Sequence, residues 1–328
     1  MRSKTIVVTA PYKAELMEID VPAPKPEELL VRTLYTGVST GTETRVLIGK
    51  QAGGHFPLVP GYENIGIVTE KGKNSAFNEG DIVFHTGSSF TGKFNKCWGA
   101  HQEYTLVSEK DVFSVPLDLD PIDGIYAKVG AIALHGIKRA GIGKDDTAAV
   151  KGLGLIGNLA MQCARAYGVK VIGIDMDEER LNMAKAAGCD YLINASKEDV
   201  KARVHEYSDG GVDAAIDVTG IPETLMSTAD LARPMPWSPP YPPSPRVVVL
   251  GSYAKPITLD YDPLFMSETD ILFSRDVRPD DIKEMISLLA DGKVSPKTLN
   301  AKCFDVSEVQ AAYQQMVDEK LMRILFKW

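Results

Sequence analysis

Three glycines near the middle of the chain have the spacing of a phosphate-binding turn. Gly152, Gly154 and Gly157 follow a short apolar run and open an apolar-periodic stretch. In such an arrangement the first glycine makes a tight turn, the second lets the backbone approach a pyrophosphate, and the third lets helix and strand pack closely. The predicted helix begins at Leu155 and Ile156, where free N–H groups and the positive end of the dipole would face the phosphates.

An acidic residue follows at the distance expected for ribose recognition. Asp175 ends a second apolar run, 18 residues beyond Gly157, and its carboxylate would accept hydrogen bonds from an adenosine ribose. Met176 and Asp177 come next, without the Arg or Ser/Thr cluster that a 2′-phosphate needs. We therefore predict a site for NAD rather than NADP. The alternative is a helix–strand contact that requires small residues and binds no ligand.

Length and composition limit what such a site can belong to. At 328 residues the chain is long for one core, and 44% apolar with 24% charged residues is typical of a globular protein. The net charge of -8 disfavours nucleic acid or an anionic membrane surface as the main partner. The four cysteines form no CxxC pair, and the apolar run at 6–10 is too short for a signal peptide, so we expect a cytoplasmic location.

The hydrophobic pattern changes at about Pro121. Before it, short alternating or apolar runs between Pro and Gly residues indicate a β-rich, barrel-like domain. After it, helix and strand patterns alternate, which is typical of an α/β fold with a doubly wound parallel sheet. We predict a dinucleotide-binding domain at 127–276 and a β-rich domain made of 1–126 and 277–328. From Pro121 on, the expected helices are 122–140, 154–167, 178–187, 199–207, 279–291 and 307–319, and the expected strands are 148–151, 169–174, 191–193, 212–218, 247–250, 271–274 and 323–327.

A Pro-rich segment at 233–245 precedes one of the predicted strands. Proline excludes helix and sheet pairing, so we expect an extended, polyproline-like surface loop. Ligands bind outside the carboxyl ends of parallel strands, whereas this loop enters the amino end of its strand. We therefore expect it to face solvent or another subunit.

Five segments form a recognisable family pattern. They are the Gly-rich turn, 37–43 (GVSTGTE), 60–66 (PGYENIG), 80–83 (GDIV) and 99–104 (GAHQEY). Together they resemble the medium-chain dehydrogenase/reductase superfamily of zinc-type alcohol dehydrogenase-like proteins. The resemblance implies a chaperonin-10-like catalytic barrel and a Rossmann domain, with Val218 toward the adenosine half of the cofactor and Gly251 and Ser252 toward the nicotinamide. Within the superfamily, STGTE and PLVPGYE are similar to segments of the bacteriochlorophyllide a 3-hydroxyethyl dehydrogenase branch.

The chain departs from that pattern where zinc-dependent relatives hold their catalytic metal. By this resemblance, the Cys, His and Glu or Cys ligands of those relatives are replaced by Ser39 or Thr40, by Tyr62 and by Lys128. A hydroxyl, a phenol and an ammonium cannot replace thiolate, imidazole and carboxylate on zinc. Of the cysteines, only Cys97 lies in the region of the structural zinc loop. We therefore predict no zinc.

Without a metal, side chains must stabilise charge on the substrate oxygen and move a proton. The resemblance places Thr42 where relatives relay the proton. We hypothesise that Tyr62 and Lys128 form an acid/base pair in which the ammonium lowers the pKa of the phenol, with Thr42, Thr40 and Ser39 as candidate hydroxyl helpers. Alternatively, Tyr62 fills the space of the metal and Lys128 points to solvent.

Other side chains could border this site. They are histidines that could line the cleft, acids for which the resemblance implies structural roles, and aromatics that could wall the substrate pocket or cluster at the surface. The histidines are His55, His85 and His101. The acids are Glu43 and Glu63, and the aromatics are Phe90, Phe94 and Trp98. His135 is expected in the core, because it lies in an apolar helix.

Together with the resemblance, these residues predict a zinc-independent oxidoreductase that moves a hydride between NAD and a secondary alcohol or ketone. One alternative keeps the cofactor but reduces an activated C=C bond, as zinc-free quinone and enone reductases of the superfamily do. Another is a dinucleotide-binding protein without catalysis. A tetrapyrrole hydroxyethyl group, a polyol or sugar and a small ketone all fit as the small-molecule substrate. The superfamily implies a homodimer or homotetramer.

Overall fold

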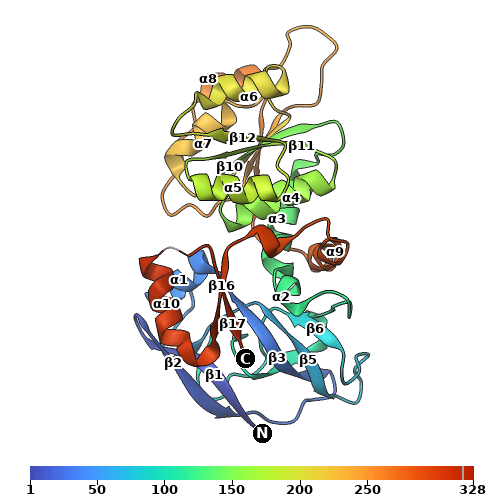
Figure 1. Ribbon diagram of the computed structural model, residues 1–328, viewed down its shortest axis with the longest axis vertical. Coiled ribbons are helices and arrows are strands. Elements are labelled where there is room, and N and C mark those ends of the chain that lie inside the picture. Colours follow the sequence, from blue (N-terminus) through green and yellow to red (C-terminus); the bar gives the residue numbers. More distant parts are fainter. Residues whose placement is uncertain (320) are drawn as a thin grey trace. The chain divides into compact units, whose positions relative to one another are not determined.

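The computed structural model describes residues 1–319 and 321–328, and the chain divides into two compact units (Figure 1). The barrel unit contains Met1–Lys128 and Leu299–Trp328, and the parallel-sheet unit contains Val129–Thr298. Helix α3 (Ala127–Ala140) crosses the boundary between them. No helix among the described residues has the length and apolar character needed to cross a membrane.

The barrel unit is built from two mainly antiparallel sheets, with strand orders β2-β1-β4-β7 and β16-β17-β3-β5-β6-β9, and β8 also pairs with β3. A buried cluster joins β1, β17 and α10 through Ile6, Phe326 and Tyr313. The strands are β1 (Arg2–Ala10), β2 (Lys13–Asp20), β3 (Glu28–Val38), β4 (Leu58–Val59), β5 (Asn64–Lys71), β6 (Ile82–His85), β7 (Asn95–Lys96), β8 (Tyr104–Ser108), β9 (Val112–Ser114), β16 (Ala301–Asp305) and β17 (Arg323–Lys327). The helices of this unit are α1 (Thr40–Leu47), α2 (Pro121–Gly124) and α10 (Val309–Asp318).

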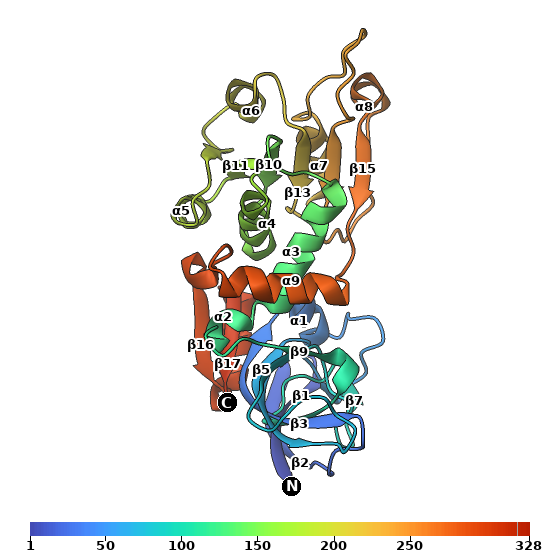
Figure 2. The same cartoon turned by 90° about the vertical axis from the view of Figure 1, so that its right-hand side faces the viewer.

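The second unit contains the expected parallel sheet, in the order β12-β11-β10-β13-β14-β15. Figure 2 labels four of these strands, β10, β11, β13 and β15. Ala148, Ala149 and Val150 are all fully buried, so both faces of the central strand β10 are covered. The order reverses between β10 and β13, which is where such sheets bind ligands. The strands are β10 (Thr147–Lys151), β11 (Lys170–Asp175), β12 (Tyr191–Asn194), β13 (Ala214–Asp217), β14 (Arg246–Val249) and β15 (Asp270–Phe273), and the helices are α4 (Leu155–Ala166), α5 (Glu178–Ala186), α6 (Val200–Ser208), α7 (Pro222–Ala229), α8 (Tyr261–Ser267) and α9 (Pro279–Ala290).

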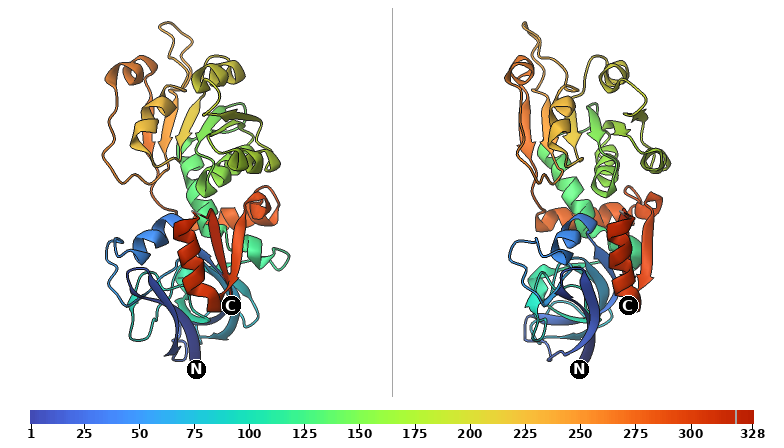
Figure 3. Two further views of the ribbon diagram at one scale, coloured as in Figure 1. Left: turned by 60° about the vertical axis from the view of Figure 1, so that its left-hand side comes forward. Right: turned by 90° about the vertical axis from the view of Figure 1, so that its left-hand side faces the viewer.

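The Pro-rich segment 233–245 contains no helix or strand and leads into the amino end of β14. It forms a loop that projects from the parallel-sheet unit (Figure 3). Trp237 and Tyr241 on this loop are 78% and 63% exposed. The loop therefore lies at the edge of the sheet opposite to the Gly-rich turn, which follows the carboxyl end of β10.

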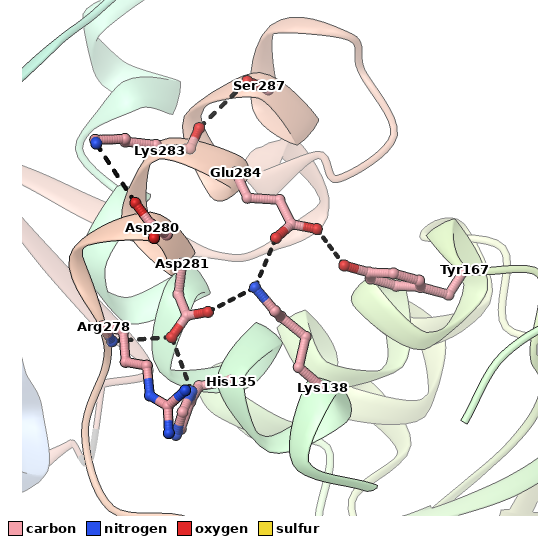
Figure 4. A network of polar contacts seen from close by, with 9 residues as sticks. All are labelled: His135, Lys138, Tyr167, Arg278, Asp280, Asp281, Lys283, Glu284 and Ser287. Atoms are coloured by element: carbon pink, nitrogen blue, oxygen red, sulfur yellow. Dashed lines mark hydrogen bonds and ion pairs between the residues drawn. The ribbon is translucent and has the colours of Figure 1, made fainter. Parts of the chain in front are cut away.

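The boundary between the units differs from the expected one. Residues 277–298, which we expected with the barrel, belong to the parallel-sheet unit, because a polar network fastens α9 to α3 and α4 (Figure 4). Asp281 is 2% exposed and accepts a 2.8 Å hydrogen bond from His135 Nδ1. Lys138 Nζ lies 2.8 Å from both Asp281 and Glu284, and the Tyr167 hydroxyl donates to Glu284. His135 is 13% exposed and its ring nitrogen has a hydrogen-bond partner, which agrees with the expected core position; the partner is an acid of this ionic network.

Several elements differ from the expected pattern. The helix expected at 122–140 is divided into α2 and α3, because the chain turns at Ile125 and Tyr126, whose N–H groups bond back to Pro121 and Asp123. Strands β2, β4, β7, β9 and β16 and helices α1, α7 and α8 were not among the elements with expected bounds. The apolar/polar alternation in β2 is interrupted by Leu16 and Met17, two successive apolar residues of intermediate burial.

Candidate functional site

The three glycines of the turn occupy three different environments. Gly152 has φ +91°, which only glycine adopts without strain, and it directly follows β10. A Cβ on Gly157 would lie 1.8 Å from the Gly152 carbonyl oxygen, so this position must lack a side chain for α4 to pack. A Cβ on Gly154 would meet nothing within 4 Å. The turn thus leaves open space above Gly154, the N-cap of α4, where Leu155 and Ile156 begin the helix.

Asp175 is held in a fixed orientation at the end of β11. Its carboxylate accepts hydrogen bonds from the N–H groups of Leu153 (2.7 Å), Met176 (2.7 Å) and Asp177 (3.0 Å). The first of these joins it directly to the Gly-rich turn. Arg180 Nη1 lies 3.7 Å from the same carboxylate. Sequence reasoning missed Arg180, although its position one turn into the helix after Asp175 could have revealed it.

The loops that follow β10, β13 and β14 come together at the carboxyl edge of the sheet. Val218 donates its N–H to the Lys151 carbonyl at 2.9 Å. A Cβ on Gly251 would lie 2.7 Å from the Gly220 nitrogen, so the second and third loops touch through backbone. Ser252 follows at an exposed position. These positions border the point where the strand order reverses.

A buried acid ties two of these loops together. Asp217 is fully buried and accepts hydrogen bonds from both the N–H (3.0 Å) and the hydroxyl (2.7 Å) of Thr219. The hydroxyls of Thr228 (2.7 Å) and Tyr253 (2.5 Å) also donate to it. Burial and the bond to Asp217 raise the pKa of Tyr253. The Asp217 carboxylate therefore fixes the loops that carry Val218 and Ser252.

In the barrel unit, Tyr62 lies at the centre of a cluster of hydroxyl groups. Its side chain is 7% exposed, and its hydroxyl hydrogen-bonds to Ser39 and Thr42. Thr42 in turn accepts a 3.2 Å bond from Arg45 Nη2. Sequence reasoning missed Arg45: it lies one turn beyond Thr42 on α1, and no helix was expected there. Thr40 begins α1, and its carbonyl accepts from the Thr44 hydroxyl at 2.6 Å.

The relation of Lys128 to Tyr62 differs from the hypothesis. Lys128 Nζ lies over the Tyr62 ring, 5.3 Å from its centroid. Burial and the neighbouring Glu63 carboxylate raise the pKa of Tyr62, against the lowering effect of the Ser39 and Thr42 hydroxyls. The expected lowering of this pKa was wrong, because loss of water around the phenol outweighs the stabilisation of a phenolate. Tyr62 is a neutral phenol at neutral pH.

Two buried clusters of ionic and hydrogen-bonding side chains include Glu43 and Glu63, the two acids of the segments that carry Thr42 and Tyr62. His101 Nε2 lies 3.0 Å from Glu43, which also accepts from the Tyr313 hydroxyl at 2.6 Å, and all three side chains are buried. Glu63 pairs with Arg323 at 2.7 Å, both fully buried. A Cβ on Gly37 would lie 3.0 Å from the Glu63 carboxylate. The burial and the ionic partners of both acids support the structural roles that the resemblance implies.

The remaining histidines do not line an open cleft. His85 is fully buried, and its Nδ1 donates to the Gly87 carbonyl at 2.9 Å. Burial lowers the pKa of His85 to about 4. His101 is also fully buried, whereas His55 is exposed. These three histidines were predicted as possible cleft residues. Whether they line a cleft depends on their burial, which the sequence does not show.

One of the three candidate aromatics reaches the phenol. Trp98 is 36% exposed and meets Tyr62 edge to face, with centroids 5.2 Å apart at 75°. Phe94 and Phe90 instead pack in a core cluster with Ile19 and Leu30. Trp98 is thus the aromatic that borders the candidate site.

Comparison with known proteins assigns both units. An alcohol dehydrogenase GroES-like domain matches residues 25–117, and a zinc-binding dehydrogenase domain matches residues 156–291. An uncharacterised zinc-type alcohol dehydrogenase-like protein of Escherichia coli is 32% identical over 254 residues, covering 67% of this chain and 72% of that protein. The chain belongs to the medium-chain dehydrogenase/reductase superfamily. This confirms the expected family and the expected combination of a GroES-like barrel with a Rossmann domain.

Two further members of the superfamily align over nearly the whole chain. Sorbitol dehydrogenase of Halalkalibacterium halodurans is 27% identical, covering 93% of this chain and 92% of that protein. The crystal structure of 2R,3R-butanediol dehydrogenase from Bacillus subtilis superposes with a TM-score of 0.85 at 21% identity, covering 99% of each chain. The second similarity concerns the fold.

The family descriptions name zinc, but the donors around Tyr62 do not fit that metal. Ser39, Tyr62 and Lys128 offer a hydroxyl, a phenol and an ammonium, and the ammonium has no lone pair for a metal. Among residues 1–319 and 321–328, no group of three or more His, Cys, Asp or Glu side chains is placed to hold a metal ion. What this set of side chains can do is donate hydrogen bonds and move a proton.

Proposed function

We propose that this chain is a zinc-independent, NAD(H)-dependent oxidoreductase that interconverts a secondary alcohol and a ketone. The observation that carries the proposal is the buried phenol of Tyr62, hydrogen-bonded to the hydroxyls of Ser39 and Thr42. It lies in the segment where the resemblance places a zinc ligand, and it offers a proton in place of a Lewis acid.

The parallel-sheet unit fits a dinucleotide. The open space above Gly154 suits a pyrophosphate, and the N–H groups at the start of α4 can bind it. Asp175, fixed by three backbone N–H groups, can accept bonds from ribose hydroxyls and would repel a 2′-phosphate. When bound, the nicotinamide supplies or accepts the hydride. Of two solved structures with the same fold, one is bound to NADP and the other to NADH. Asp175 favours NAD for this chain.

In the direction of ketone reduction, Tyr62 acts as the acid. As the hydride reaches the carbonyl carbon, negative charge develops on the oxygen, and the phenol proton passes to it to give the alcohol. The phenolate left behind is stabilised by hydrogen bonds from Ser39 and Thr42, and a proton from water restores the phenol. Because its pKa is raised, the phenol keeps its proton until the substrate oxygen becomes the stronger base. Oxidation of the alcohol reverses these steps.

Arg45 supports this proton transfer without touching the substrate oxygen. Its guanidinium donates to Thr42 Oγ1 at 3.2 Å, which leaves the hydroxyl hydrogen of Thr42 for the Tyr62 oxygen. A cation at this distance makes Thr42 a better donor to a developing phenolate. Arg45 is therefore a positioning residue for Thr42.

The similar proteins suggest a class of substrate, and the exposed apolar side chains suggest a homo-oligomer. Relatives include dehydrogenases of sorbitol and D-arabitol phosphate, which supports a small alcohol as substrate. We also propose a homo-oligomer, because β15 is an edge strand flanked by exposed apolar side chains. Tyr261, Phe265 and Phe273 are 70%, 56% and 60% exposed.

A substrate screen with NADH tests the proposal against its rivals. We expect the purified protein to reduce open-chain hydroxyketones and to oxidise the matching alcohols with NAD, and to leave enones untouched. Turnover of enones alone would point to a C=C reductase. NADH binding by calorimetry, without turnover of any ketone or alcohol, would point to a non-catalytic protein.

A further inference from the structure

A polar hollow of about 280 Å³ opens in the barrel unit on the side of Trp98. Its lining includes Thr86, Ser89, Lys96, Trp98, Ser108 and Asp111. Residues that carry hydroxyl, ammonium, carboxylate and indole N–H groups therefore line a space large enough for a chain of several carbons. Val107 and the Trp98 ring provide its apolar surface.

Most of these polar groups are available to a ligand. Among residues 1–319 and 321–328, the hydroxyls of Thr86, Ser89 and Ser108 and the indole N–H of Trp98 make no hydrogen bond to a protein group. Lys96 donates to the Ser88 carbonyl at 3.1 Å and has two further hydrogens. The hollow thus offers both donors and acceptors.

The backbone holds Trp98 in an unusual conformation beside the hollow. Its φ of +66° is a left-handed value that a bulky residue rarely adopts. The Ser88 N–H donates to the Trp98 carbonyl at 2.8 Å, and a Cβ on Gly87 would lie 2.8 Å from that oxygen. A glycine at 87 therefore allows the contact that fixes Trp98, and the ring then reaches Tyr62, 5.2 Å away between centroids.

We propose that this hollow binds the polyhydroxylated tail of the substrate. The tail would lie on one side of Trp98, and the carbon whose oxygen receives the proton of Tyr62 would lie on the other. The proposal rests on the function proposed above and specifies its substrate class as a polyol or the corresponding hydroxyketone. Trp98 is the shared wall, since it lines the hollow and contacts the candidate acid.

The charges favour a neutral polyol over the other candidate tails. An apolar tail would strip water from the hydroxyls and from Lys96 without replacing those hydrogen bonds. A phosphate would pair with Lys96 but would meet the Asp111 carboxylate in the same lining. A polyol hydroxyl can accept from Lys96 and donate to Asp111, while its C–H groups pack on the indole ring.

The test is ligand binding to the full chain, followed at the indole of Trp98. The chain has three tryptophans, so in ¹⁵N-tryptophan-labelled protein the Trp98 signal is assigned with Trp98→Phe. We expect sorbitol to shift the Trp98 signal saturably, with an affinity at least tenfold higher than that of 2-hexanol or of sorbitol 6-phosphate. Absence of a saturable shift with sorbitol overturns the proposal, as does tighter binding of 2-hexanol or of the phosphate ester.

Matched variants locate the site. Ser108→Leu and Lys96→Met should each weaken sorbitol binding at least tenfold. Ser114→Leu on β9, the next strand along the chain, and Lys93→Met in the loop of Lys96 change exposed residues outside the lining and should leave sorbitol binding unchanged. Equal effects in both members of a pair contradict the proposal, and if Ser108→Leu does not fold, the lysine pair decides.

The experiments distinguish a failure of the proposed oxidoreductase function from a failure of the proposed polyol site. Sorbitol binding at Trp98 without turnover of any alcohol or ketone would remove the proposed function and keep a polyol site. Turnover of simple ketones, with no sorbitol effect on Trp98, would remove the polyol site and keep the oxidoreductase.

Discussion

The ammonium of Lys128 lies over the face of the Tyr62 ring, 5.3 Å from its centroid, whereas the phenol oxygen is hydrogen-bonded by Ser39 and Thr42. A cation above an aromatic face interacts with the ring electrons and not with the phenol oxygen. The proton chemistry of Tyr62 therefore depends on its burial, on the neighbouring Glu63 carboxylate and on the two hydroxyls. Lys128 contributes to the position of the ring.

The phenol oxygen of Tyr62 is the group whose removal should matter most. We expect Tyr62→Phe to lower kcat for ketone reduction by about 10²-fold or more, the usual contribution of a general acid, and to leave the affinity for NADH unchanged. Steady-state kinetics and calorimetry measure the two. Tyr12→Phe, at an exposed position of the same unit, is the control, and equal kcat values for the two variants would refute the role of Tyr62.

Replacing Lys128 should have a much smaller effect. A cation–π contact is worth about 0.5–2 kcal/mol, so Lys128→Met should change kcat by less than about 30-fold and leave its pH profile unaltered. If the ammonium were instead the partner of Tyr62 in proton transfer, this variant would lose as much activity as Tyr62→Phe. Profiles of kcat between pH 6 and 9.5 separate the two cases.

The dinucleotide site makes a prediction that two neighbouring glycines can test. Gly154→Ala has room for its methyl group, so the free energy of unfolding should stay within about 1 kcal/mol of the native value while NAD binding is lost. In Gly157→Ala the methyl would overlap the Gly152 carbonyl, so this variant should lose stability by several kcal/mol. Urea unfolding and calorimetry give both quantities. A Gly154→Ala protein that binds NAD normally would contradict the proposed position of the pyrophosphate.

The sheet and the Gly-rich turn of the parallel-sheet unit could be predicted from local signals, whereas the place of residues 277–298 could not. Gly152, Gly157 and Asp175 lie in one contiguous strand–turn–helix–strand segment, where periodicity and glycine spacing determine the structure. The positive φ of Gly152 and the close approach of Gly157 to the Gly152 carbonyl agree with the steric roles assigned to these two glycines, whereas ribose binding by Asp175 stays a prediction. Arg180 could have been found in the same way, because the expected helix at 178–187 begins where α5 begins and places Arg180 in its first turn.

The barrel site depended on contacts between distant segments. Tyr62 is brought to Ser39 and Thr42 by the pairing of β3 with β5 and by helix α1, and α1 has no clear apolar period in the sequence. Its pKa depends on burial, which residue types do not reveal. Burial also decides whether His85 and His101 line the cleft or lie in the core, and residue types do not reveal burial.

His85 should make the stability of the protein depend on pH in the acid range. Its pKa is lowered from 6.5 to about 4 by burial, so between these values the unfolded chain binds the proton and the folded chain does not. Stability is therefore lost as the pH falls from 6.5 to 4, by up to about 3 kcal/mol from this group. His85→Asn, whose amide can still donate to Gly87, should reduce that loss, as measured by urea unfolding at several pH values. The exposed His55→Asn should not; an unchanged pH slope in His85→Asn would count against a buried, neutral imidazole.

The central claim is that side-chain protons, led by Tyr62, replace the metal in this member of a zinc-type superfamily. The most direct measurement is the metal content of the purified enzyme while it turns over a ketone with NADH, by mass spectrometry of the same sample before and after treatment with a chelator. We predict far less than one zinc per chain and unchanged turnover after the treatment. One zinc per chain, with activity lost on its removal and regained on its return, would contradict the account.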